Sequence, residues 1–485
     1  MPAGKEPGRK WYQLQWYRPS DSTRQRQLIN KIDLLIVPYA FLSYWVKYID
    51  QANLNNAYVA GLKEDLGFQG NELIQLQTFY IVGAVLGQIP FMFLFTYIPM
   101  HWVIPGLDIA WGIFTLLQYR TASFAELAAY RFLVGWFEAA YFPGMHYIFG
   151  AWYRGDEIGR RGGVFYLGLS LGTLTAGLIQ AGASKNLEGV LGLAGWRWMY
   201  IICAIITIPV GIIGYFILPG TPDKPNKFFL NDDDIAVARD RLKGDGHHVD
   251  NENVTLSTLK KVALSWHFWV LIAFDFFFWN SGTSSIGGFL LWLKSLNRFS
   301  KARINELGAI APALGMFYTL LTCFASDLIL GPAWAITFIH VFNILGNVIL
   351  TVWDVPEAAL WFAFCLSYCS VAMSSVLHGW VNTQLRGSPA QRAFILVLIN
   401  TTSQASTAWT HLLTFPTVEA PRFPKGYPYA MANSVALILT AHGLRWWLKK
   451  REAKKPDSEA GSVSGVESEN TGKAGEKVAV QSVQA

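Results

Sequence analysis

The sequence predicts an all-α membrane protein in which twelve transmembrane helices form two six-helix bundles. Hydrophobic residues make up 52% of the 485 residues and charged residues only 15%, whereas about 25% of the residues in an ordinary soluble protein are charged. The apolar residues come in blocks of about 18–25, the length that a helix needs to cross a bilayer. A polar stretch of about 45 residues separates six blocks from six more, a plan typical of membrane proteins built from two related halves.

Each block of apolar residues predicts one spanning helix. In the first half we expect helices over 34–58, 73–95, 102–117, 127–149, 163–181 and 198–218. In the second half we expect them over 266–293, 307–324, 333–352, 358–380, 394–415 and 429–447. The third segment is short and carries Asp108.

The distribution of Lys and Arg predicts the orientation, because cytoplasmic loops are enriched in these residues. With a cytoplasmic N-terminus, about 27 of the 39 basic residues fall on the cytoplasmic side, so both termini are expected there. The chain then divides into a cytoplasmic tail, a first bundle, a cytoplasmic loop, a second bundle and a disordered cytoplasmic tail: 1–31, 32–218, 219–264, 265–447 and 448–485. The polar, basic N-terminal residues carry no signal-peptide pattern, so the first segment is expected to act as its own uncleaved insertion signal.

Several function classes do not fit this sequence. The four cysteines fall inside apolar segments and show neither a disulfide framework nor zinc spacing. The net charge of +6 comes from short loops and tails beside the membrane, so no nucleic-acid partner is expected. The histidines are scattered, and no clustered catalytic set is present. We therefore predict neither an enzyme, nor a metal site, nor a cofactor.

Ionisable residues at membrane depth are costly and mark candidate functional sites. Lys47 and Asp50 lie three residues apart on one face of the first helix, and Gln51 follows. Arg131 and Glu138 on the fourth helix are two turns, or about 10 Å, apart. Acids and bases on these two helices can neutralise one another, and protonating an acid would release a cation to hold an anion. The alternatives are a snorkelling Lys47 and purely structural pairs.

The second half offers mainly amides. Asn280 interrupts an aromatic run, and Asn400 and Gln404 lie one turn apart on the eleventh helix. Amides suit hydrogen bonds to a substrate, but they equally suit contacts between helices. Asp108 and Asp275 have no partner nearby in sequence, and cavity-lining and structural roles both stay open for them. We interpret three histidines in the spanning segments as packing residues: His146, His340 and His378.

Three stretches together resemble a known family. Residues 48–57 read YIDQANLNNA, residues 131–144 read RFLVGWFEAAYFPG and residues 152–161 read WYRGDEIGRR. They resemble the first-helix motif, the fourth-helix signature and the following loop of the anion:cation symporter family within the major facilitator superfamily. The similarity to this family runs over about 11–447. Within the family, residues 50–72 resemble the fungal allantoate permease branch, and in it pantothenate permeases. The resemblance implies the major facilitator fold.

The resemblance also implies roles for individual residues. Positions matching Asp50 and Glu138 carry protons in relatives, and the position matching Arg131 pairs with substrate or acid. Many relatives have Arg at the position of Gln51, and Lys47 could supply that charge one turn earlier. The basic signature usual between the second and third helices is missing at 96–101.

The activity implied by this resemblance is proton-coupled uptake of a small carboxylate. We expect a monomer in a fungal plasma membrane, with protons, the carboxylate and the lipid bilayer as partners. Pantothenate is the first candidate substrate, which Arg131, Lys47, Gln51, Asn280, Asn400 and Gln404 would bind. Other carboxylates, biotin among them, and export of a fungal metabolite are the alternatives.

Overall fold

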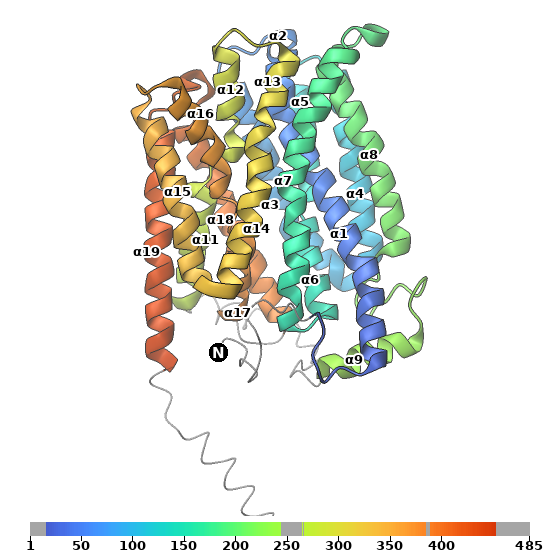
Figure 1. Ribbon diagram of the computed structural model, residues 1–485. Coiled ribbons are helices and arrows are strands. Elements are labelled where there is room, and N and C mark those ends of the chain that lie inside the picture. Colours follow the sequence, from blue (N-terminus) through green and yellow to red (C-terminus); the bar gives the residue numbers. More distant parts are fainter. Residues whose placement is uncertain (1–15, 244–263, 265, 385–388, 453–485) are drawn as a thin grey trace, which may run out of the picture. The chain divides into compact units, whose positions relative to one another are not determined.

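The computed structural model describes residues 16–243, 264, 266–384 and 389–452. The chain divides into two units, Met1–Ile438 and Leu439–Ala485. Of the second unit, residues 439–452 are described and form the last part of helix α19 (Gly426–Glu452). There the Lys450 ammonium lies 4.8 Å from the centroid of the Trp446 ring. The first unit contains the other described helices (Figure 1).

Among its described residues, the first half of the first unit has helices as its regular structure, with loops between them and a single bridge between Gly220 and Pro225. α1 begins before the predicted start of the first segment because Ser22 caps it, with its hydroxyl accepting the Gln25 backbone N–H at 3.3 Å. The main helices are α1 (Thr23–Ala57), α3 (Glu72–Tyr97), α4 (Met100–Leu117), α5 (Phe124–Glu138), α6 (Tyr141–Trp152), α7 (Gly155–Asn186) and α8 (Gly195–Ile217).

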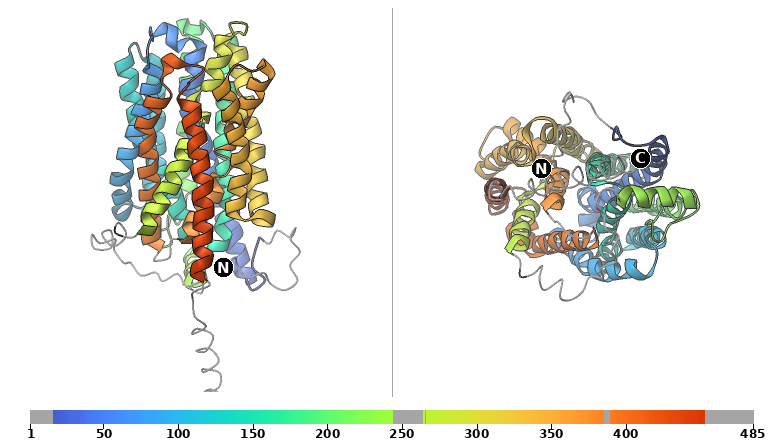
Figure 2. Two further views of the ribbon diagram at one scale, coloured as in Figure 1. Left: turned by 90° about the vertical axis from the view of Figure 1, so that its left-hand side faces the viewer. Right: turned by 90° about the horizontal axis from the view of Figure 1, so that it is seen from below.

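The second half repeats this plan, with more interruptions. Its helices are α11 (Trp266–Ser281), α12 (Gly288–Ser295), α13 (Lys301–Gly308), α14 (Ile310–Ala325), α15 (Pro332–Val352), α16 (Glu357–Cys365), α17 (Ser374–Gln384), α18 (Pro389–Thr414) and the first part of α19. Seen end-on in Figure 2, the first-half helices (blue to green) gather on one side and those of the second half (yellow to orange) on the other.

Eight helical stretches of the described residues are long and apolar enough to cross a membrane. They coincide with the predicted first, second, third, fifth, sixth, eighth, ninth and tenth segments. The fourth segment is divided between α5 and α6, and the seventh between α11 and α12. The eleventh and twelfth correspond to α18 and α19. Large apolar side chains such as Phe93, Trp102 and Phe317 are exposed on the outside of the unit, as expected for a surface that faces lipid.

The interruptions have local causes. Between α5 and α6, Pro143 has no N–H to donate to the carbonyl of Ala139, which removes one hydrogen bond where the helix is interrupted. Between α11 and α12 lies the short helix η4 (Ser284–Ile286), followed by Gly287 at φ +80°, a conformation that favours glycine. The tenth segment is likewise interrupted by η6 (Leu366–Cys369). Discontinuous helices of this kind commonly line transporter sites.

Glycines let the first-half helices approach one another closely. A Cβ built on Gly135 of α5 would lie 2.1 Å from the carbonyl oxygen of Tyr80 in α3, and one on Gly83 of α3 would lie 2.2 Å from that of Phe132. On α7, a Cβ at Gly172 would lie 2.5 Å from the Trp45 carbonyl of α1. Small residues at such crossings are the usual means of packing helices in membranes.

A further helix, α9 (Asp232–Lys243), lies in the polar stretch between the halves. Its Asp234 carboxylate accepts hydrogen bonds from Arg24 at 2.9 Å and from Lys31 at 2.6 Å, both on α1. Its buried Arg241 pairs with Glu157 of α7 at 2.9 Å. These contacts attach α9 to the first half, at the end of the unit where α1 begins.

The two halves meet along two seams. α7 packs against α13, α14 and α17, while α3 and α6 pack against α18. At the end of the unit where α1 finishes, Asn55 donates to the Ser285 carbonyl at 2.9 Å, and Lys294 pairs with Glu64 at 2.7 Å. Contacts across the seams at this end therefore hold the halves together there.

Candidate functional site

Four ionisable side chains meet inside the first half. Lys47 and Asp50 come from α1, and Arg131 and Glu138 come from α5. Asp50, Arg131 and Glu138 are buried, and the side chain of Lys47 is 14% exposed. The predicted spacing therefore does bring these four residues together.

The acid–base pairing crosses between the helices. Lys47 Nζ lies 3.2 Å from Glu138 Oε1, which also accepts a 2.6 Å hydrogen bond from the Tyr80 hydroxyl. Arg131 donates to the backbone carbonyl of Asp50 at 3.4 Å, and its guanidinium lies 4.9 Å from the centroid of the Tyr80 ring. Each base thus contacts the other helix, so protonating Glu138 would weaken a contact between α1 and α5.

Several polar atoms in this cluster have no hydrogen-bond partner among the described residues. They are Oδ1 of Asp50, Oε1 of Gln51, Nε of Arg131 and Oε2 of Glu138. The other oxygen of Asp50 accepts from Thr115 at 3.5 Å and from Thr207 at 3.3 Å. Buried polar atoms are normally satisfied, so all four atoms can bind water or a substrate group, and the two carboxylate oxygens can also take a proton.

The three amides predicted in the second half, Asn280, Asn400 and Gln404, have different hydrogen-bond partners. Asn280 is buried and fully used: it donates to the Phe276 carbonyl and to Ser406, and it accepts from Thr410 and Tyr429. This amide has no capacity left for a ligand in this conformation.

The other two amides lie near the seam between the halves. Gln88 of α3 donates to Gln404 at 3.2 Å and accepts from Thr401. Asn400 accepts a 3.2 Å hydrogen bond from Trp279. Gln404 therefore contacts the first half across the seam, while Asn400 joins α18 to α11 within the second half.

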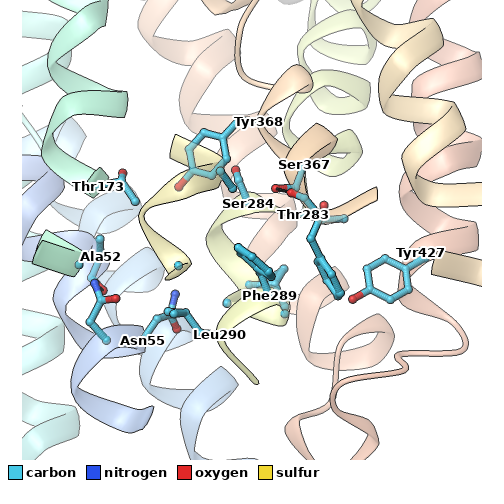
Figure 3. Close-up of a pocket in the computed structure, with 18 residues that line it drawn as sticks. Ala52, Asn55, Thr173, Thr283, Ser284, Phe289, Leu290, Ser367, Tyr368 and Tyr427 are labelled. Atoms are coloured by element: carbon cyan, nitrogen blue, oxygen red, sulfur yellow. Dashed lines mark hydrogen bonds between the residues drawn. The ribbon is translucent and has the colours of Figure 1, made fainter. Parts of the chain in front are cut away.

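A small cavity of about 60 Å³ lies between the halves, toward the end of α1 (Figure 3). It is polar and aromatic but carries no acid or base. The residues that line it and are labelled in Figure 3 include Asn55 and Thr173 from the first half, and Ser367, Tyr368 and Tyr427 from the second. None of the eight predicted site residues lines it.

The structure adds residues that the sequence analysis did not select. Tyr80, Thr115 and Thr207 surround the acids, and each stands in an apolar helix where nothing in the pattern distinguishes it. Asp108, for which both roles were open, accepts 2.7 Å hydrogen bonds from Tyr39 and Ser43. These bonds tie α4 to α1.

A helical membrane protein of two halves, with acid–base contacts in its interior, has the features of a membrane transporter. A family model described as Major Facilitator Superfamily matches residues 40–410. The chain belongs to this superfamily.

Similarity to curated transporters indicates a more specific class of transporter within this superfamily. The vitamin H transporter of Saccharomyces cerevisiae is 39% identical, over 92% of this chain and 77% of its own. The pantothenate transporter Liz1 of Schizosaccharomyces pombe is 32% identical, over 83% and 78%. Among solved structures, the proton:xylose symporter XylE bound to 6-bromo-6-deoxy-D-glucose matches with a TM-score of 0.66 and 14% identity, over 85% of this chain and 95% of XylE. That last likeness concerns the fold.

These findings confirm the predicted fold, the family and the resemblance to fungal pantothenate permeases. The chain is a multi-pass membrane protein and a secondary transporter of small organic substrates, not an enzyme.

Proposed function

We propose that this transporter takes up a small organic monoanion together with protons, across the plasma membrane and with both termini in the cytoplasm. The observation that carries the proposal is the buried contact between Lys47 and Glu138, 3.2 Å apart. A mostly buried cation with one acidic partner is a site where a proton and an anion can exchange.

The mechanism follows from these contacts. A proton on Glu138 removes the negative charge that faces Lys47, and the ammonium is then available to a carboxylate. Arg131, whose Nε has no partner among the described residues, supplies a second cation next to Asp50. Rocking of one half against the other would carry anion and proton to the opposite side.

The energetics depend on the number of protons. A monoanion that enters with one proton moves no net charge, so the pH gradient alone drives it, at roughly 1.4 kcal/mol per pH unit. A second proton adds the membrane potential, roughly 2.3 kcal/mol per 100 mV. Both Asp50 and Glu138 lie where a proton could bind.

Two substrates are proposed for direct comparison. The pantothenate candidate is supported by the similarity to Liz1, and biotin by the higher identity to the vitamin H transporter. Each has one carboxylate for Lys47 or Arg131. We expect one of them to enter yeast cells that lack their own permease for that vitamin, and faster at pH 5 than at pH 7. A surface-expressed protein that takes up neither vitamin would contradict this substrate class, and labelled efflux would then favour export.

The variants Glu138→Gln and Arg131→Gln separate coupling from binding. Glu138→Gln keeps the side-chain shape but cannot exchange a proton, so it should lose pH-driven accumulation while keeping substrate exchange. Arg131→Gln should raise the half-saturating substrate concentration, because a charge-assisted contact is lost. Glu306, which is only partly buried and pairs with Arg303 at 2.8 Å, provides the matched control Glu306→Gln. Normal accumulation by Glu138→Gln across pH 5–7 would make that acid structural.

A further inference from the structure

A second buried acid–base contact lies in the second half, between Asp275 of α11 and His378 of α17. Asp275 is 1% exposed, and its Oδ1 lies 3.4 Å from Nε2 of His378. Neither carboxylate oxygen has a hydrogen-bond partner among the described residues. The polar neighbours Ser403 and Trp279 donate elsewhere, to the Ile272 carbonyl and to Asn400.

The contacts of the histidine fix where its hydrogen lies. Nδ1 of His378 is 2.8 Å from the backbone carbonyl oxygen of Ser374 and 3.4 Å from the hydroxyl oxygen of the same residue, which can accept as well as donate. A carbonyl oxygen only accepts, so Nδ1 must carry the hydrogen. In a neutral ring, Nε2 then presents a lone pair toward the Asp275 carboxylate, and two acceptors would face each other at 3.4 Å. A carboxylate buried in this way, without a donor, is costly.

One additional proton removes this conflict. It can sit on Nε2, giving an imidazolium beside a carboxylate, or on Asp275, giving an acid that donates to Nε2. Either arrangement holds one proton between the two residues and leaves the pair neutral. Loss of that proton would leave one negative charge buried.

The pair occupies helices that correspond to those of the first-half cluster. α1 and α5–α6 are the first and fourth segments of their half, and α11 and α16–α17 are the first and fourth of theirs. In a fold built from related halves, each half thus contains one acid–base contact between the same two helices.

The other titratable groups around the pair come from both halves. His146 of α6 interacts electrostatically with His378, and Tyr166 of α7 with Asp275. Cys323 of α14 contacts Ser375, next to Ser374, at 3.0 Å. Among the described residues around the pair, none of these neighbours is a second carboxylate or an Arg or Lys, so none of them brings a fixed charge that would compensate Asp275 or His378.

Phe142 of α6 covers the pair from the first half, with its ring centroid 5.9 Å from that of His378. Phe278 covers it from within the second half, at 5.7 Å. Movement of one half against the other would displace Phe142 and admit water to the pair. Proton exchange would then depend on the conformation of the transporter.

We propose that the Asp275–His378 pair is a second proton-binding site, which carries one proton per transport cycle in addition to the proton of the first-half cluster. The proposal rests on the proposed proton-coupled uptake and specifies its stoichiometry as two. A monoanion then enters with one net positive charge. Transport responds to voltage for that reason.

The test uses purified protein in proteoliposomes, with labelled biotin or pantothenate and imposed gradients. With two protons, the equilibrium accumulation ratio rises about a hundredfold per pH unit at zero voltage, and about fiftyfold per 100 mV at zero pH gradient. In Asp275→Asn the amide can donate to Nε2 without exchanging a proton. We expect this variant to accumulate about tenfold per pH unit, to lose the voltage response and to keep substrate counterflow.

Two further variants complete the design. His378→Gln keeps a donor for the Asp275 carboxylate and should reproduce the same loss if Asp275→Asn does not fold. His340→Gln removes another buried histidine, one without a hydrogen-bond partner among the described residues, and should keep the wild-type slope.

Unchanged pH and voltage slopes in a folded Asp275→Asn or His378→Gln protein would overturn the second site. A tenfold slope without a voltage response in the wild type would also overturn it, while leaving proton-coupled uptake intact. A wild type that does not respond to the pH gradient at all would remove both proposals.

Discussion

The contact between Lys47 and Glu138 makes a quantitative prediction about stability. At 3.2 Å, two unit charges in a medium of effective dielectric constant about 20 attract by about 5 kcal/mol. Removing one member of a buried pair leaves the other uncompensated, which costs about 3–5 kcal/mol. We therefore expect Lys47→Met and Glu138→Gln each to destabilise the folded protein by about 3 kcal/mol, the low value because Lys47 is partly exposed.

The double variant separates the pair from its surroundings. With both charges gone no uncompensated ion is left, so Lys47→Met/Glu138→Gln should be destabilised by only about 1 kcal/mol, which is the additive 6 less the attraction of about 5. The glutamine oxygen can still accept from the Tyr80 hydroxyl, which keeps that contact constant. SDS-titrated unfolding of the four proteins in mixed micelles measures the coupling.

The same four proteins distinguish stability from transport. The double variant should regain stability without regaining pH-driven accumulation, because neither the exchangeable proton nor the cation is present. Additive effects, within about 0.5 kcal/mol, would show that the two charges do not interact and would refute the mechanism derived from their contact.

Three further predictions concern packing, α9 and topology. Gly135→Ala should sharply reduce folded yield in detergent, since its Cβ would lie 2.1 Å from the Tyr80 carbonyl, whereas Gly150→Ala meets nothing within 4 Å and should be neutral. Burial raises the pKa of Asp234, but hydrogen bonds from Lys31 and the backbone outweigh this and lower it overall. The attachment of α9 should therefore persist at neutral pH and be lost only as the pH falls below the ordinary carboxyl range. Asp234→Asn should increase hydrogen exchange across 232–243 at pH 7. Asp232→Asn, which removes an exposed pair with Lys227, should not change it. Equal exchange in the two variants would contradict the role of the buried pair. Asn253 lies in a glycosylation sequon, outside the described residues, and should stay unmodified if the central loop is cytoplasmic; a glycan there would reverse the proposed orientation.

The fold could be predicted from the sequence because the bilayer imposes a length and a hydropathy on each crossing segment. The interruptions were less visible, since they depend on single residues such as Pro143 and Gly287 whose effect is local. α9 was not anticipated either. Its attachment depends on ion pairs with α1 and α7 that lie far away in sequence.

For the candidate site, helical periodicity predicted that Lys47 and Asp50 share one helix face and that Arg131 and Glu138 share another. It could not predict which residues of the two helices contact each other. The structure pairs Lys47 with Glu138 and brings Arg131 to the backbone of Asp50. Likewise, the sequence suggested that the Asn280 amide could bind a substrate. Only the structure shows that its hydrogen bonds are already made with neighbouring side chains. The Asp275–His378 contact could not be predicted from the sequence, because the two residues lie 103 positions apart.

The attachment of α9 to the first half also shortens the covalent tether between the halves. α9 ends at Lys243 and α11 begins at Trp266, so 22 residues remain to connect them. Fully extended, such a segment reaches about 75 Å, and a tether this short keeps one half at a high effective concentration around the other. A chain break or an inserted tag within 244–265 would leave α9 and its ion pairs with the first fragment. This segment is accordingly the natural place to divide the protein into two co-expressed fragments.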